Sequence, residues 1–187
     1  PNSMLLTLGT GLGGGFIYQG ESFDGATGFG FEPGHFTLVA DGEQCPCGRK
    51  GCLEAYVSTK ALRREADKAL QEYPDSLLLK GKTLDSLVPY TIRDLFEAAE
   101  AGDPAALHSI GLYSHYLAVG IASLTTVLQP EIIALGGGIS NQKKSFYEEL
   151  QRAVAEQLLT RVGQPVPRII PAKLGNDAGI VGAAISR

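Results

Sequence analysis

The chain lacks the excess of positive charge that would mark a nucleic-acid surface. Its 187 residues include 16 basic and 20 acidic side chains, which leave a net charge of −4. The basic residues are scattered, apart from short pairs such as Arg63-Arg64 and Lys143-Lys144. The sequence also lacks an apolar run long enough to span a membrane and a signal-peptide pattern at its start. We therefore expect neither a nucleic-acid nor a membrane partner.

A compositional bias toward disorder is absent as well, because 44% of the residues are hydrophobic and 19% are charged. A chain of this length can bury a core without cross-links, so residues 1–187 are expected to form a single domain. There are three cysteines; reduced cysteines and no export signal favour the cytoplasm. Glycine, in contrast, is abundant, with 24 residues gathered in clusters.

The three cysteines, Cys45, Cys47 and Cys52, fall within eight residues, and His35 lies ten positions upstream. This C-x-C-x4-C pattern with one histidine supplies the four nitrogen and sulfur donors of a tetrahedral zinc site. The alternatives are three unrelated thiols, or a disulfide with one cysteine left over. A disulfide is disfavoured because Cys45 and Cys47 are too close in sequence to pair comfortably. A site with four protein ligands has no open position, which indicates structural rather than hydrolytic zinc.

Two glycine clusters interrupt the chain, at residues 9–15 and 136–138. The first lets backbone N–H groups approach an anion such as phosphate closely, although no G-K-[ST] follows it as in a Walker loop. The second follows the apolar run 131–135, at the place where open α/β sheets bind ligands. The alternative for both clusters is tight turns with close packing.

Short β-rich runs at Met4–Leu8, Phe16–Tyr18 and Phe36–Val39, separated by glycines, predict an antiparallel meander. Capping signals and apolar periodicity then predict helices over about residues 58–73, 91–101, 103–128 and 143–159, and from about Asp177. Strands are expected at residues 131–135 and 168–171. This order of elements predicts an α/β fold.

Two carboxylates bracket the cysteine loop, since Glu32 lies three residues before His35 and Glu54 two residues after Cys52. If a metal ion fixes the loop, both carboxylates are held near one another and near an imidazole. That combination suits recognition of several hydroxyls on a sugar. The alternative is two solvated surface glutamates.

Together these motifs resemble the ROK family of repressors and sugar kinases, which has the actin-like, ribonuclease-H-like ATPase fold. The resemblance lies in residues 6–15, 25–35, 45–54 and 130–138, and it covers essentially the whole chain. It implies a mixed sheet with a β-meander, flanking helices and a zinc loop. It also implies a homo-oligomer and no nucleic-acid contact through this part of the protein.

The resemblance also assigns roles to individual residues. The implied ligands of a structural Zn²⁺ are His35, Cys45, Cys47 and Cys52. The implied contacts to a hexose or N-acetylhexosamine are Glu32, His35 and Glu54. ATP with Mg²⁺ would have its phosphates at Thr10, Gly11, Gly13, Gly14 and Gly15 and its adenosine near Gly136, Gly137 and Gly138. If zinc takes one imidazole nitrogen of His35, the other nitrogen can face the sugar.

This sequence departs from the family pattern in two respects. Phe31 and Pro33 stand where the family has a small and an aliphatic residue, so the resemblance does not imply the shape of the sugar pocket. The Asp-x-Gly-Gly-Thr motif and the Asn-Asp pair of the family's first lobe are missing, and Asn176-Asp177 lies at the wrong end of the chain. The sequence therefore resembles the C-terminal lobe alone. No catalytic residue is expected within it, and the isolated chain is expected to be inactive.

The resemblance implies the sugar- and ATP-binding lobe of a glucokinase-like hexose kinase. The alternative is the sugar-sensing effector domain of a ROK-type transcriptional repressor, which an upstream helix-turn-helix would identify. A third interpretation is a zinc-stabilised domain whose sugar pocket has degenerated.

Overall fold

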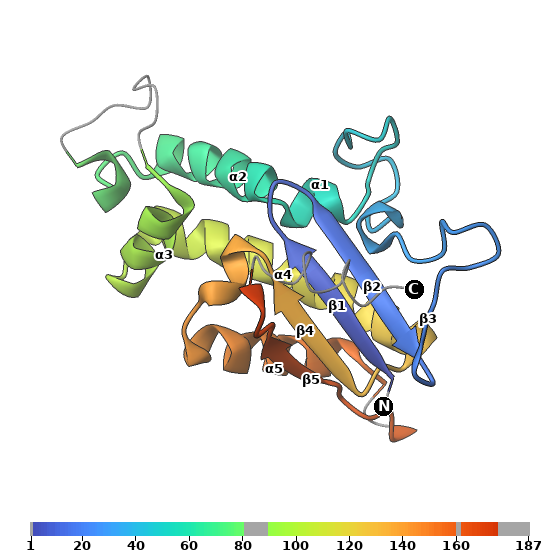
Figure 1. The fold of residues 1–187 in the computed structure, drawn as a ribbon. Helices are drawn as coiled ribbons and strands as arrows, with labels where there is room; N and C mark the ends of the chain where they lie inside the picture. Colours follow the sequence, from blue (N-terminus) through green and yellow to red (C-terminus); the bar gives the residue numbers. More distant parts are fainter. Residues whose placement is uncertain (1, 81–89, 160–161, 176–187) are drawn as a thin grey trace.

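A computed structural model describes residues 2–80, 90–159 and 162–175 (Figure 1). The sheet runs in the order β3-β2-β1-β4-β5. Its strands are β1 (Ser3–Leu8), β2 (Leu12–Tyr18), β3 (Glu21–Ser22), β4 (Ile132–Gly136) and β5 (Arg168–Pro171). β2 is antiparallel to β1 and β3, whereas β1, β4 and β5 run parallel to one another. The predicted mixed sheet is therefore present.

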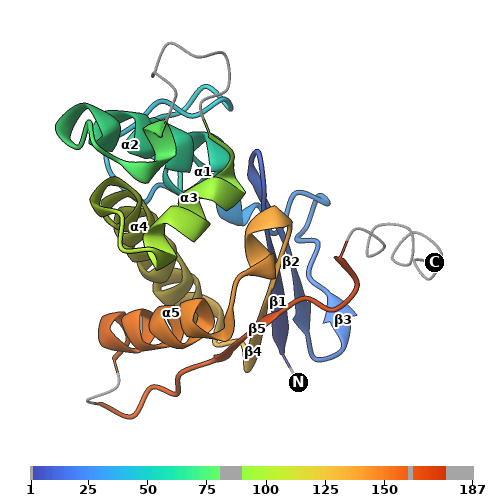
Figure 2. The ribbon, with the colours of Figure 1, turned by 90° about the vertical axis from the view of Figure 1, so that its left-hand side faces the viewer.

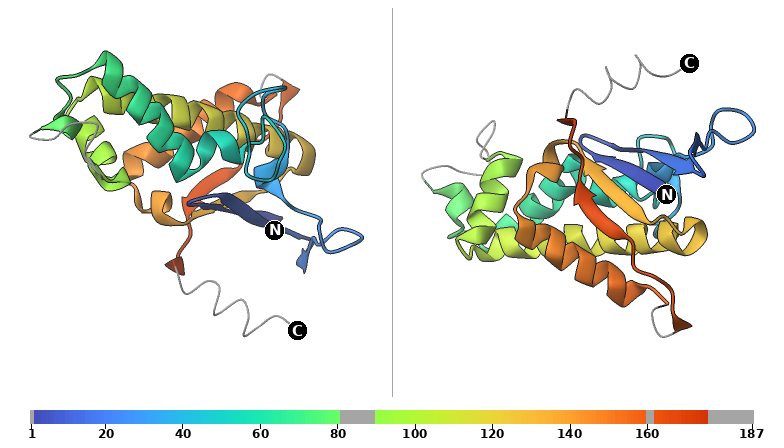
Figure 3. Two further views of the ribbon diagram at one scale, coloured as in Figure 1. Left: turned by 90° about the horizontal axis from the view of Figure 1, so that it is seen from above. Right: turned by 60° about the horizontal axis from the view of Figure 1, so that its bottom comes forward.

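The helices cover one face of this sheet, as Figure 2 and the left view of Figure 3 show. They are α1 (Glu54–Val57), α2 (Thr59–Glu72), α3 (Ile92–Glu100), α4 (Pro104–Leu128) and α5 (Lys144–Gln157), with short 3₁₀ turns at Pro33–His35, Leu77–Leu79 and Gly138–Asn141. In β1, Met4, Leu6 and Leu8 are buried while the residues between them are more exposed. This alternation places one side of the sheet against the helices.

Helix α4 is the predicted buried central helix. Asp103 caps it by accepting a hydrogen bond from the backbone N–H of Ala106, and Pro104 occupies its first turn. By length and composition it is the one helix of the described residues that could cross a membrane. Here it packs against α1, α2, α3 and α5, and Leu117 and Ile121 are fully buried. We therefore interpret its apolar character as that of a core helix.

The predicted strand at Phe36–Val39 is wrong. These residues follow the Pro33–His35 turn and make only an isolated bridge, between Thr37 and Cys52. The backbone N–H groups of Leu38 and Val39 both donate to the carbonyl of Gly51, at 2.7 and 3.1 Å. The segment is thus held by the cysteine loop rather than by the sheet. The third strand of the antiparallel meander is instead β3. The helix predicted from about Asp177 lies outside the described residues.

Candidate metal centre and ligand site

The four predicted metal ligands come together although they are spread over 18 residues of chain. Their ligand atoms all lie within 4.8 Å of one another. The Sγ atoms of Cys47 and Cys52 are 3.7 Å apart, and Cys45 Sγ is 3.8 Å from His35 Nδ1. Tetrahedral zinc with Zn–S bonds of about 2.3 Å separates its sulfurs by about 3.8 Å. All three cysteines are free, so this spacing fits a metal centre and not a disulfide.

Contacts around the ligands hold the loop in this arrangement. The guanidinium of Arg49 donates to the His35 carbonyl at 3.0 Å and to Thr37 Oγ1 at 2.8 Å. Gly51 has φ +76°, and a Cβ there would lie 1.7 Å from the carbonyl oxygen of Val39. Only glycine fits such a position, because both the backbone conformation and the available space exclude a side chain. The loop therefore brings the ligands together through its own backbone.

The thiols differ in burial and in proton affinity. Burial raises the pKa of Cys45 and raises that of Cys52 to about 12. Cys47 is exposed, and a hydrogen bond from the backbone N–H of Arg49 lowers its pKa. Two thiols buried with raised pKa values favour the neutral form unless a cation lies beside them. Zinc supplies such a charge and deprotonates coordinating thiols, so this donor set fits the metal.

Both predicted sugar-binding carboxylates lie next to this centre in the chain, but their surroundings differ. Glu54 begins α1; its Oε1 lies 3.9 Å from Cys45 Sγ and its Oε2 accepts a hydrogen bond from the Leu12 N–H at 2.8 Å. Glu32 is exposed and precedes the Pro33–His35 turn. Since Nδ1 of His35 faces Cys45, Nε2 is the ring nitrogen left for another partner.

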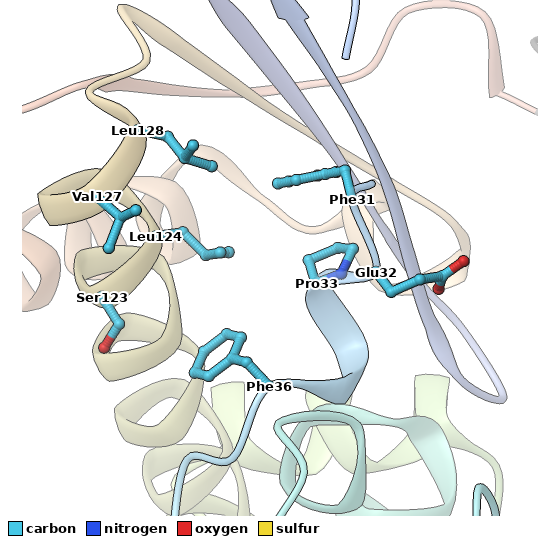
Figure 4. Close-up of a pocket in the computed structure, with 8 residues that line it drawn as sticks. All are labelled: Phe31, Glu32, Pro33, Phe36, Ser123, Leu124, Val127 and Leu128. Carbon is cyan, nitrogen blue, oxygen red and sulfur yellow. The ribbon is translucent and has the colours of Figure 1, made fainter. Parts of the chain in front are cut away.

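Phe31 and Pro33 line a cavity of about 330 Å³ together with residues of α4. Figure 4 shows both side chains on the α4 side of the segment, whereas the Glu32 carboxylate points away from α4. The apolar lining is completed by Phe36, Leu124, Val127 and Leu128. Phe31 and Pro33, the two residues that depart from the family pattern, therefore shape this apolar cavity. Their side chains do not point in the same direction as the Glu32 carboxylate.

The two glycine clusters lie at the same edge of the sheet. β1 and β4 are parallel neighbours with Thr7 opposite Gly136, so the turn after β1 lies beside residues 136–138. Gly137 has φ +84°, and a Cβ there would lie 2.3 Å from the Leu8 carbonyl. In β2, a Cβ on Gly14 would lie 2.6 Å from Pro33 Cγ. Close packing thus explains the absence of a side chain at both glycines, and the predicted phosphate contact remains a proposal.

A cavity of about 600 Å³ adjoins the second glycine cluster. It lies between α3 and the segment leading into α5, and its lining includes Phe96, Arg93, Gly138 and Asn141. An ion pair of 2.6 Å between Lys143 and Glu100 joins the two walls. The sequence pattern indicates the glycines but not these residues, because helix capping and periodicity carry no signal of a cavity between two helices.

Comparison with known proteins gives consistent matches over the whole chain. The family model of the ROK family matches residues 1–186. A glucokinase of Halalkalibacterium halodurans is 36% identical over 182 residues, which are 97% of this chain and 54% of the relative. An N-acetyl-D-glucosamine kinase of Aliivibrio fischeri is 35% identical over 98% of this chain and 58% of the relative. The chain therefore spans little more than half the length of these relatives.

Solved structures show the same pattern. A ROK family glucokinase from Streptomyces griseus, in complex with glucose and AMPPNP, superposes with a TM-score of 0.87 at 33% identity, over 98% of this chain and 59% of that one. A ROK family transcriptional regulator, a homolog of the E. coli MLC protein, gives a TM-score of 0.75 at 31% identity, over 98% and 44%. The predicted ROK-type α/β fold is confirmed, and the similarity extends to both kinases and regulators.

Proposed function

This chain belongs to the ROK family, and we propose that residues 1–187 form the second, sugar- and ATP-binding lobe of a glucokinase-like, ATP-dependent hexose kinase. The observation that carries the proposal is the position of Glu54, which lies between the metal centre and the hairpin that follows β1. A carboxylate, an imidazole and a glycine turn therefore meet at one place. Sugar-kinase relatives at 35–36% identity support the same reaction class.

The metal centre would hold a structural Zn²⁺ through His35, Cys45, Cys47 and Cys52. Bound there, the ion would cross-link the loop that leads from His35 to Glu54 and neutralise its thiolates. With Nδ1 of His35 directed to the metal, its Nε2–H would be fixed as a donor. The structural role of this metal is thus to hold a sugar-binding surface.

In the proposed complex, Glu32, His35 and Glu54 bind hydroxyls of a hexose or N-acetylhexosamine. The phosphates of ATP with Mg²⁺ would lie along the hairpin of β1 and β2, at Thr10 and Gly11 in its turn and at Gly13, Gly14 and Gly15 at the start of β2. The adenosine would lie near Gly136, Gly137 and Gly138, in the 600 Å³ cavity. The Streptomyces griseus glucokinase bound to glucose and AMPPNP supports this arrangement by analogy.

The chemistry needs one further group, a general base that this lobe does not supply. In the proposed reaction, a base on the other lobe removes the proton of a sugar hydroxyl. The hydroxyl oxygen then forms a bond to the γ-phosphorus while the bond to the ADP oxygen breaks. Because transfer depends on groups positioned from both sides of the cleft, we expect residues 1–187 alone to bind ligands weakly and to transfer no phosphate.

A second candidate is the sugar-sensing effector domain of a ROK-type repressor, and the likeness to a ROK family transcriptional regulator favours it. A sensor needs sugar binding but no phosphoryl transfer. A cytoplasmic location and a homo-oligomer without nucleic-acid contact through this lobe belong to both proposals.

A coupled assay of ADP release tests the kinase proposal. The two-lobed protein that carries this sequence is incubated with Mg·ATP and glucose, mannose or an N-acetylhexosamine, beside a Glu54→Gln variant. We expect turnover of one hexose or N-acetylhexosamine and a loss of at least tenfold in the variant. Sugar binding by calorimetry without any ADP release would contradict the kinase and support the sensor.

A further inference from the structure

The carboxylate of Glu54 has a different neighbour at each oxygen. Its Oε2 accepts a hydrogen bond of 2.8 Å from the backbone N–H of Leu12, which is 42 positions earlier in the chain. Its Oε1 lies 3.9 Å from Cys45 Sγ, at the metal centre. One side chain therefore connects the hairpin between β1 and β2 to the metal centre.

The Leu12 N–H depends on this acceptor. Leu12 opens β2 and is 3% exposed, and β3 pairs with β2 at Ile17 and Tyr18. On the side of β2 that faces away from β1, no strand of the described part of the chain therefore lies beside Leu12. A buried N–H group without an acceptor is costly, and a carboxylate is a stronger acceptor than a neutral oxygen. Glu54 thus stabilises the hairpin on the side of β2 that faces away from β1.

The spacing around the turn shows how closely the carboxylate fits. A Cβ on Gly11 would lie 2.5 Å from Glu54 Oε2, and a Cβ on Gly34 would lie 2.2 Å from the Leu12 carbonyl oxygen. Glycine at both positions lets the hairpin approach Glu54 on one side and the turn before His35 on the other. The hairpin and the sugar-binding residues are therefore packed as one unit.

We propose that Glu54 is a positioning residue for the Gly9–Leu12 turn as well as a contact for the sugar. This inference rests on the proposed function, in which the turn faces the phosphates of ATP. Because Oε2 is engaged by Leu12, Oε1 is the oxygen available to a sugar hydroxyl. Among the described residues, no hydrogen bond joins the Glu32 carboxylate to this turn, so Glu32 has only the sugar contact that the proposed function gives it.

The matched variants Glu54→Ala and Glu32→Ala separate the two roles. Amide hydrogen exchange of residues 1–187 is followed by NMR at Leu12, with Leu6 in β1 and the zinc content as checks on the fold. We expect exchange at Leu12 to be at least tenfold faster in Glu54→Ala and unchanged in Glu32→Ala. If Glu54→Ala loses its metal, Glu54→Gln replaces it, with a severalfold increase because an uncharged oxygen accepts more weakly.

Titration of the two-lobed protein with Mg·AMPPNP in the absence of sugar then tests the consequence for the nucleotide. We expect Glu54→Ala to weaken nucleotide binding at least fivefold and Glu32→Ala to leave it unchanged. Equal losses in the two variants, or unchanged exchange at Leu12, would overturn the role of Glu54 on the hairpin. Absence of nucleotide and sugar binding in the wild-type protein would instead contradict the proposed function, and the exchange comparison does not depend on that result.

Discussion

Replacing Gly51 by alanine is expected to open the cysteine loop, and Gly48 provides the matched control. Both glycines lie in the same loop and have positive φ angles, of +76° and +92°. A Cβ at Gly48 meets nothing within 4 Å, whereas a Cβ at Gly51 would lie 1.7 Å from the Val39 carbonyl oxygen. The two substitutions therefore share the backbone strain and differ in the clash.

The magnitudes follow from this difference. A side chain in the left-handed region costs about 1–2 kcal/mol, which is the whole effect expected for Gly48→Ala. In Gly51→Ala, the backbone must also move by more than 1 Å to reach an ordinary contact. This movement disrupts the hydrogen bonds from Leu38 and Val39 to the Gly51 carbonyl, each worth about 1 kcal/mol. We expect Gly51→Ala to cost about 3–4 kcal/mol in total, which is about 2 kcal/mol more than Gly48→Ala. If this excess falls on the metal-bound loop, zinc affinity decreases about 30-fold further than in the control.

Zinc affinity is measured by competition with a chromogenic chelator, and the free energy of unfolding by urea denaturation of the zinc-loaded proteins. Far-UV circular dichroism confirms that each variant keeps its helices. Equal zinc affinities for Gly48→Ala and Gly51→Ala would contradict this prediction, because the close contact with Val39 would then have no energetic consequence.

Three other perturbations have defined outcomes. A strong chelator, or Cys47→Ser, should loosen residues 41–54 and abolish sugar binding before the sheet unfolds; unchanged affinity in calorimetry after verified metal removal would contradict this. Asp103→Ala removes a buried acceptor used by Ala106 and two further donors, and should lower the free energy of unfolding by about 2–4 kcal/mol in urea. Thr91→Ala, at an exposed cap, should lower the free energy of unfolding by only about 1 kcal/mol. Equal losses in Asp103→Ala and Thr91→Ala would argue against a special role of the buried Asp103 carboxylate. Burial raises the pKa of Cys52 to about 12, so zinc must displace the proton of this thiol when it binds. The apparent zinc affinity should therefore fall as pH decreases from 8 to 6. An affinity that does not change with pH in chelator competition would be inconsistent with a buried thiol ligand.

The parts of the fold that depend on neighbouring residues were predictable from the sequence. Ser58 caps α2, Thr91 and Asp94 form a capping box, and Asp103 caps α4, as their spacing predicts. The cysteine cluster is also local, since its three thiols lie within eight residues and short loops restrict how far they can separate. In each case the signal and its partner lie within a few residues.

Contacts between distant segments were not predictable in the same way. The apolar residues of Phe36–Val39 predicted a strand, but the cysteine loop takes their backbone hydrogen bonds. The bond between Glu54 and Leu12 spans 42 positions, and no local pattern indicates it. The glycines at 13–15 predicted a phosphate turn, whereas the structure places them in β2, with Gly14 against Pro33. Local propensity does not predict which distant segment will pack beside a given strand.

The proposed sugar-binding surface depends on a zinc ion at the site formed by His35 and the three cysteines. Zinc K-edge X-ray absorption, with elemental analysis of the same purified sample, tests this most directly. It should find one zinc per chain, with three sulfurs at about 2.3 Å and one nitrogen at about 2.0 Å. A protein purified without chelators that contains no zinc, or zinc bound by oxygen and nitrogen alone, would contradict a sugar-binding surface held by this metal.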